Sequence, residues 1–313
     1  MFLKLGVRGD KLSLARAELV VRMIGQAQPD AQVEKKILEP GDDDVKLSIA
    51  NSRGRKRTFD TQLSKAVLEG KIDFAIYNMK DLPLLKSDSM LIIAATPERS
   101  SPYEALVSLH GQDLQSLKPG SIVGTSTLLR IAQLRRYRPD LRSQAVGGRV
   151  EDRISMLDRG ELDALIIAES GLARLGMSGR ITQRLPIDEF MPTPCQGITA
   201  IVTRRDNPRA LHVLKLVNNQ ITRSEAEAER QVETLMSADC KVPLGAYASA
   251  KGDKLRLTAA VLSPDGKEML RASTLGPTND PAGLARIVTA SLVSQGVRVL
   301  EESWRKMYPL VDD

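Results

Sequence analysis

A lysine and an aspartate follow an apolar, strand-like segment in the first third of the chain. Residues 72–77 are predicted to form a buried strand, and Lys80 and Asp81 come directly after it. Pro83 ends the segment because it lacks a backbone N–H and disfavours helix at the residue before it. The carboxyl edge of an open α/β sheet is where such folds bind ligands. The pattern predicts an acid and a base at a ligand-binding edge, with an exposed ion pair as the alternative.

Several arginines recur near predicted strand-to-helix junctions. A guanidinium group binds carboxylates through two parallel hydrogen bonds and stays charged when it is partly buried. Any one of these residues, taken alone, would be interpreted as an exposed surface arginine. Together they would line a cleft suited to a polycarboxylate. The five arginines are Arg8, Arg130, Arg149, Arg153 and Arg174.

The segment Gly124–Thr127 lies between a predicted strand and a predicted helix. The N–H groups at a helix N-terminus, together with hydroxyl side chains, form a natural anion site. Plain capping of the helix is the alternative for such a turn. The glycine spacings of P-loops, dinucleotide-binding turns and serine hydrolases are missing from the chain, so those classes have no support.

The chain has two cysteines, which are too few for a disulfide framework and are expected to be reduced. Cys240 follows a predicted helix in a loop, where it could be an exposed nucleophile or a small buried side chain. Cys195 is expected to be a buried filler. With two histidines and no Cys-x-x-Cys pair, we expect no metal site.

Composition narrows the class of partner. The 313 residues are 42% hydrophobic and 27% charged, with a net charge of +6, which fits an anionic ligand. Aromatic residues amount to only 3%, so the basic runs 53–57 and 135–138 lack the stacking groups of a nucleic-acid surface. The apolar runs are too short to span a bilayer, and residues 1–8 do not read as a signal peptide. We expect a cytoplasmic protein with no membrane or nucleic-acid partner.

Periodicity predicts two βα sets followed by a smaller α+β region. The first set ends near Pro97, and residues 191–197 are expected to form the return crossing between two lobes. Between residues 42 and 57 the pattern breaks, which predicts a loop that could act as a lid. The first helix is predicted over residues 12–26. Its core stripe is expected to contain Leu12, Ala15, Leu19, Met23 and Gln26.

These motifs, in this order and spacing, resemble the hydroxymethylbilane synthase family, also called porphobilinogen deaminases, over nearly the whole chain. The matching segments are Val7-Arg8, Asn78–Pro83, Gly124–Ser126 with Arg130, Gly160–Ala164, Gly171–Gly176, Gln196-Gly197, Glu229-Arg230, and Cys240 with Val242–Gly245.

The resemblance implies an α/β fold with two type II periplasmic-binding-protein-like lobes, a central cleft and a small α+β C-terminal domain. Lobe 1 would comprise residues 1–97 and 197–217, with the catalytic aspartate and the lid. Lobe 2 would comprise residues 98–196, with carboxylate-binding arginines. The C-terminal domain would comprise residues 218–313 and carry the cofactor cysteine. A monomer is the family expectation.

The resemblance also implies a reaction. Four porphobilinogen units would be joined with loss of ammonia, on a dipyrromethane cofactor attached to Cys240, to give hydroxymethylbilane. Asp81 matches the catalytic carboxylate, which can stabilise developing positive charge. Lys80, Arg130 and Thr127 match positions around the cofactor. The residues expected to bind substrate carboxylates are Arg8, Arg153, Arg174 and, from a shifted position, Arg149.

Several residues depart from the family pattern within the expected site. Leu129 replaces the first of two paired arginines, and Asp10 places a negative charge where carboxylates should bind. The other departures are Tyr77, Asn78, Gly147 and Asp239. Losing two arginine contacts could cost roughly 3–6 kcal/mol of binding. We therefore expect weakened or altered turnover, unless Arg53, Arg55, Arg57 and Arg149 compensate. The alternative is a degenerate paralogue that binds a tetrapyrrole or another polycarboxylate without catalysis.

Overall fold

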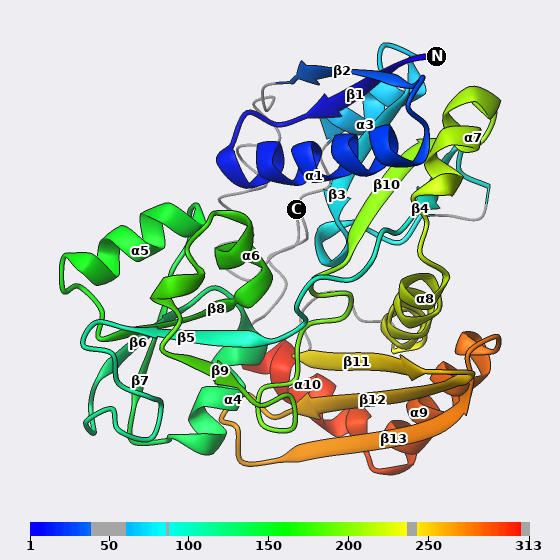
Figure 1. The fold of residues 1–313 in the computed structure, drawn as a ribbon. Coiled ribbons are helices and arrows are strands. Elements are labelled where there is room, and N and C mark those ends of the chain that lie inside the picture. Colours follow the sequence, from blue (N-terminus) through cyan, green and yellow to red (C-terminus); the bar gives the residue numbers. More distant parts are fainter. Residues whose placement is uncertain (39–60, 86–87, 237–242, 308–313) are drawn as a thin grey trace. The chain divides into compact units, whose positions relative to one another are not determined.

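The computed structural model describes residues 1–38, 61–85, 88–236 and 243–307, and these form two compact units (Figure 1). The first unit contains the described residues up to Ser100 together with Gly197–Arg223. The second contains Ser101–Gln196 and the described residues from Ser224 onward. The expected lid at 42–57 and the expected cofactor cysteine, Cys240, lie outside the described residues.

The first unit is built on a five-stranded sheet in the order β2-β1-β3-β10-β4. Strand β1 is parallel to β2 and β3, whereas β10 is antiparallel to β3 and β4. The sheet and its helices are β1 (Phe2–Val7), α1 (Lys11–Ala27), β2 (Gln32–Ile37), α3 (Thr61–Leu68), β3 (Phe74–Asn78), the 3₁₀ turn η1 (Met79–Asp81), β4 (Leu91–Ala95), β10 (Thr199–Arg204) and α7 (Pro208–Leu216).

The second unit contains a sheet with the matching order, β7-β6-β8-β5-β9. Again three neighbouring strands are parallel and the fourth, β5, is antiparallel to both of its neighbours. This repeated order is that of type II periplasmic-binding-protein lobes and confirms the expected fold class. The elements are β5 (Glu104–Ser108), β6 (Ile122–Thr125), α4 (Leu128–Tyr137), β7 (Arg142–Ala145), α5 (Val150–Asp158), β8 (Ala164–Ala168), α6 (Glu169–Arg174), the 3₁₀ turn η2 (Ser178–Arg180) and β9 (Gln183–Leu185).

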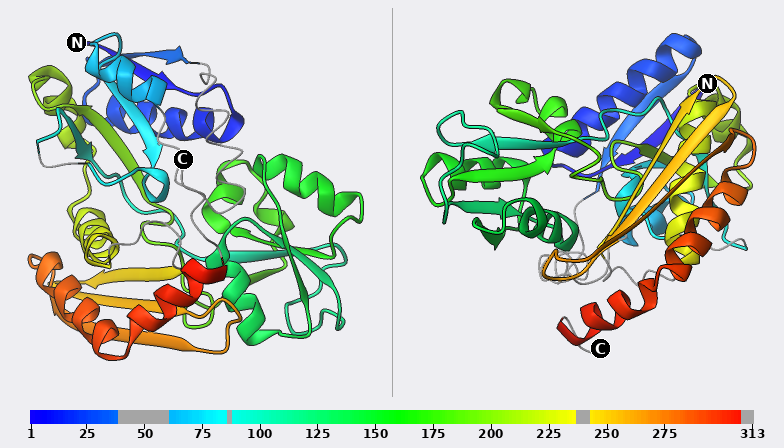
Figure 2. Two further views of the ribbon diagram at one scale, coloured as in Figure 1. Left: turned by 180° about the vertical axis from the view of Figure 1, so that it is seen from behind. Right: turned by 90° about the horizontal axis from the view of Figure 1, so that it is seen from below.

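The rest of the second unit is a three-stranded antiparallel sheet with helices packed on it (Figure 2). Its core joins Val232 of α8, Leu257 of β12 and Val288 of α9 in one buried cluster. These elements are α8 (Gln220–Leu235), β11 (Leu244–Lys251), β12 (Lys254–Leu262), β13 (Met269–Pro277), α9 (Pro281–Ser294) and α10 (Val297–Met307).

Two helices of the described chain were not predicted from the sequence, α7 and α10. Helix α7 has an ordinary start, with Asn207 accepting a hydrogen bond from the N–H of Ala210 and proline at the first position. Helix α10 buries Val297, Leu300 and Trp304, which recur at helical spacing. Among the described helices, none has the length and apolar character needed to cross a membrane.

The core face predicted for the first helix was wrong at Leu19 and Gln26, whereas Met23 packs against the core as predicted. Leu19 is 42% exposed, and Gln26 is exposed as well. The buried residues of α1 are Arg16, Ala17, Val20 and Ile24. The helix is therefore rotated about its axis relative to the expectation, and the true stripe includes a charged residue.

The segment that leads out of the second unit is held by a buried carboxylate. Cys195 is buried, as expected, and has a positive φ of 62°, an uncommon conformation for a residue with a side chain. Its N–H donates to Glu229 Oε2 on α8. Glu229 Oε1 accepts a second hydrogen bond, at 2.7 Å, from the N–H of Ala248 on β11. One fully buried side chain thus ties Cys195 to the C-terminal sheet.

We expect Glu229→Ala to destabilise the second unit by about 3–6 kcal/mol, because two hydrogen bonds to a charged acceptor are worth roughly 1.5–3 kcal/mol each. The measurement is the shift of the urea unfolding midpoint. Glu227→Ala is the matched control, since Glu227 is exposed on the same helix. Equal midpoints for the two variants would show that Glu229 does not hold this segment.

Candidate active site

The first unit brings Arg8 and Asp81 to one edge of its sheet. Arg8 follows β1, and Asp81 ends the turn η1 that follows β3. The two strands are parallel neighbours, so their carboxyl ends lie at the same edge. Lys80 is half-buried within η1. The predicted acid and base therefore occupy the edge where open α/β sheets bind ligands.

Asp81 is oriented by a residue that the sequence marked only as a departure. The side-chain amide of Asn78 donates to Asp81 Oδ2 at 2.6 Å. Asn78 is the last residue of β3, so the donor sits on the sheet and the acceptor on the turn. Asp81 itself is exposed. The carboxylate is thus held from one side and open to a ligand on another.

Tyr77, the other departure in this segment, points into the protein. Its side chain is buried, and its hydroxyl lies 2.9 Å from Ser64 Oγ on α3. Tyr77 therefore joins β3 to α3.

Arg16 is the residue at this edge that sequence reasoning missed. Its side chain is 7% exposed, and its Nε has no hydrogen-bond partner among the described residues. Burial lowers the pKa of Arg16, and the negative charges of Asp81 and then Asp10 act in the opposite direction. Asp10 caps α1 by accepting a 2.9 Å hydrogen bond from the N–H of Ser13. Arg16, Val20 and Ile24 are spaced four residues apart, which places them on one face of a helix. This spacing was the sequence signal that could have indicated a buried arginine.

The second unit gathers cations at the corresponding edge of its own sheet. Strands β7 and β8 are both parallel to β6, so the loops after all three meet at one edge. Arg153 of α5 donates to Ser126 Oγ at 3.0 Å and to the carbonyl of Gly148 at 2.8 Å. Arg149 is exposed at the start of α5, and Arg174 is half-buried at the end of α6.

Hydroxyl groups accompany these cations. Thr127 caps α4 by accepting a hydrogen bond from the N–H of Arg130 at 3.3 Å. Thr125, at the end of β6, is buried, and its Oγ1 has no hydrogen-bond partner among the described residues. The segment 124–127 therefore serves as a helix cap and also leaves one buried hydroxyl unsatisfied, which favours a polar ligand there.

Arg130 is occupied by an internal ion pair. Its Nε lies 2.8 Å from Glu104 Oε1 and its Nη2 lies 2.8 Å from Glu104 Oε2, and both side chains are almost fully buried. Its Nη2 also donates to Gln196 Oε1 at 3.4 Å. A contact between Arg130 and the cofactor remains a prediction.

Leu129 has an apolar role in the structure. It is 4% exposed and belongs to a cluster with Ala132, Leu262 and Trp304. Trp304 comes from α10 and donates its indole N–H to the carbonyl of Leu262 at 2.6 Å. The position where the family carries an arginine therefore anchors the C-terminal helix to α4.

We expect Leu129→Arg to destabilise the protein, although it restores the family residue, because an unpaired charge buried beside Trp304 costs several kcal/mol. Thermal unfolding followed by circular dichroism measures the loss. Leu129→Met is the control and should cost less than about 1.5 kcal/mol, as volume-conserving core changes do. A Leu129→Arg protein as stable as the wild type would contradict this account of the cluster.

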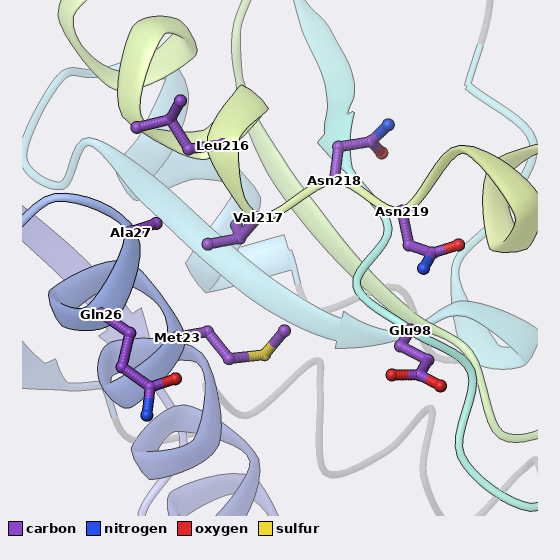
Figure 3. A pocket seen from close by; sticks show the side chains of 8 residues that line it. All are labelled: Met23, Gln26, Ala27, Glu98, Leu216, Val217, Asn218 and Asn219. Carbon is purple, nitrogen blue, oxygen red and sulfur yellow. The ribbon is translucent and has the colours of Figure 1, made fainter.

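A separate cavity of about 410 Å³ lies in the first unit, between α1, Glu98, the end of α7 and the segment 217–219 that follows it (Figure 3). Two asparagines line it, but their oxygens already serve the fold. Asn218 Oδ1 accepts from the N–H of Thr96 at 2.9 Å, and Asn219 Oδ1 accepts from the N–H of Thr222 at 2.9 Å. We assign no ligand to this cavity.

Several predicted residues lie outside the described part of the chain, so the structure places none of them. They are the cofactor residue Cys240, its neighbour Asp239, and the loop arginines Arg53, Arg55 and Arg57. Gly147 is exposed in the loop before α5.

Comparison with known proteins identifies the family. The family model described as "Porphobilinogen deaminase, dipyromethane cofactor binding domain" matches residues 3–212, and the model of the porphobilinogen deaminase C-terminal domain matches residues 223–293. The chain belongs to the porphobilinogen deaminase family.

Curated relatives agree over nearly the full length. A probable porphobilinogen deaminase of Nitrosopumilus maritimus is 36% identical over 96% of this chain and 96% of its own. The porphobilinogen deaminase of Desulforudis audaxviator is 36% identical over 93% of this chain and 94% of its own. Among solved structures, the methionine binding protein MetQ aligns over 69% of this chain and 88% of its own, with a TM-score of 0.42 and 15% identity.

Proposed function

We propose that this protein polymerises four porphobilinogen units to hydroxymethylbilane with loss of ammonia. The observation that carries the proposal is the carboxylate of Asp81, which Asn78 holds at the carboxyl edge of the first unit's sheet. The second unit, taken by itself, presents Arg149 and Arg153 beside the segment 124–127 at the carboxyl edge of its own sheet. A carboxylate and a set of cations are the groups that a carboxylated pyrrole losing an ammonium group requires.

The residues of the second unit fit a dipyrromethane cofactor. Its acetate and propionate groups need cations and hydroxyl donors, and Thr125 Oγ1 is a buried hydroxyl without a partner among the described residues. We propose that Arg149, Arg153 and Arg174 hold carboxylates there, with Thr127 as a further contact. For Lys80, on the first unit, we propose a role in cofactor binding from the family resemblance alone. When bound, the cofactor supplies the pyrrole on which the chain grows. We propose Cys240 as its attachment point.

We propose that Asp81 is the catalytic residue. Loss of ammonia leaves an electron-poor porphobilinogen carbon, and a fixed carboxylate stabilises the positive charge that develops. The hydrogen bond from Asn78 restricts the position of that carboxylate before substrate binds. Arg8, after the neighbouring parallel strand, would bind a substrate carboxylate.

We propose the domain division 1–97 with 197–217, 98–196 and 218–313, and a monomer located in the cytoplasm. The reduced activity expected from the departures also stays a prediction. Two of them have structural uses, since Asn78 orients Asp81 and Leu129 anchors α10. A paralogue that binds without turnover is the alternative outcome of the tests below.

Intact mass tests the cofactor. Protein expressed with a supply of porphobilinogen should carry the added mass of two pyrrole units, and Cys240→Ser should remove that mass. Cys195→Ser is the control and should keep it, because Cys195 is buried within the second unit. Wild-type protein with an apo mass and no ammonia release would reject the enzyme in favour of the binding paralogue.

Kinetics test the carboxylate. Asp81→Asn should lower the rate of ammonia release about 10²–10⁴-fold, the range typical of a positioned acid or base. Asn78→Ala should have a smaller effect in the same direction, because it frees the carboxylate without removing it. Asp88→Asn is the control, since Asp88 is an exposed acid beyond the same strand. Full activity in Asp81→Asn would place the catalytic group elsewhere.

A further inference from the structure

Arg16 is a buried cation whose Nε has no hydrogen-bond partner within the part of the first unit that the structure describes. It lies on the face of α1 that also carries Ala17, Val20 and Ile24, among the least exposed residues of the helix. Burying an arginine in this way is costly, so a helix that needed only a core side chain would be better served by an apolar residue.

The topology explains what the charge of Arg16 faces. Helix α1 begins directly after β1, and the turn η1 follows β3, the parallel neighbour of β1. The start of α1 and the end of η1 therefore lie at the same sheet edge. Asp10 stands at the first of these positions and Asp81 at the second. Both carboxylates act electrostatically on Arg16.

Other charged groups near α1 are engaged elsewhere. Lys35 of β2 pairs with Glu18, which is on the exposed side of α1. Arg209 of α7 donates to the carbonyl of Phe2 at 2.9 Å. Arg8 and Lys80 are at the same sheet edge but are less buried than Arg16. The charge of Arg16 is the one least screened by solvent at this edge.

The negative charge of Asp10 is opposed by the positive charge of Arg16. Asp10 adds a second negative charge at the sheet edge that carries Asp81, and this edge is proposed to receive a substrate that is itself negatively charged. Like charges at short range weaken anion binding and disfavour ionisation of one another. A buried cation that interacts with both carboxylates offsets this repulsion without occupying the ligand's space.

We propose that Arg16 is a positioning residue that balances Asp10 and keeps the Asp81 edge able to accept a carboxylated pyrrole. This inference rests on the proposed function. In this inference Asp10 and Arg16 act as a charge pair. The loss of either charge alone changes the net charge at this sheet edge, and the loss of both together restores it.

A double-mutant cycle tests the pair, with Asp10→Asn, Arg16→Gln and the double variant measured on the cofactor-loaded protein. Asparagine keeps the helix cap that Asp10 provides. We expect Arg16→Gln to lower kcat/KM for porphobilinogen about tenfold or more. The double variant should recover to within about threefold of wild type. Arg22→Gln is the control, because Arg22 is exposed on the same helix.

Two outcomes overturn the inference while leaving the proposed function intact. The first is an active wild type in which Arg16→Gln behaves like Arg22→Gln. The second is a loss in Arg16→Gln that Asp10→Asn does not relieve, which would make Arg16 a direct ligand.

Stability provides a readout that does not depend on turnover. Thermal unfolding of the same four proteins should show that Arg16→Gln is better tolerated in the Asp10→Asn background than in the wild type. Additive shifts would overturn the charge pair even if the protein proved to have no synthase activity. An inactive wild type with a coupled pair would instead reject the proposed function and keep the electrostatic unit.

Discussion

The second unit depends on one buried ion pair, between Arg130 of α4 and Glu104 of β5. Strand β5 is the first described strand after the chain enters this unit. Gln196, which also contacts Arg130, is the last residue of the unit before the chain returns to the first unit. The guanidinium group also reaches the carbonyl of Ile166 on β8. Removing either charge would leave the other buried and unpaired, a far larger cost than a surface pair would impose. The pair therefore holds the entry strand, the first helix and the exit of the unit in one arrangement.

Much of the architecture could be predicted from the sequence because it depends on local patterns. The alternation of apolar strands with helices predicts parallel strands, and parallel strands bring Asp81, Arg149 and Arg153 to carboxyl edges. The partner of Arg130 could not be predicted in this way. Glu104 is 26 residues away and lies on an antiparallel strand, so the pair exists only once the sheet is assembled.

The register of α1 shows a second limit of sequence patterns. The expected stripe was built from apolar residues alone, which placed Leu19 inside. The face of the helix that packs on the core instead contains a buried arginine, Arg16. Arginine is rarely buried in a helix, so a search for apolar residues alone leaves it out. Arg16, the residue of this helix most relevant to the site, was therefore the hardest to predict.

The Trp304 contact has a consequence for observing this protein in solution. Trp304 is the single tryptophan of the chain, and its indole ring is fully buried between α10 and the Leu129 region of α4. The tryptophan fluorescence of the protein therefore comes from one place, where α10 packs against α4. An emission maximum typical of an apolar setting would report a docked helix, and a red shift would report its release. The residue that anchors the helix is also a built-in optical probe of that docking, and no label is needed.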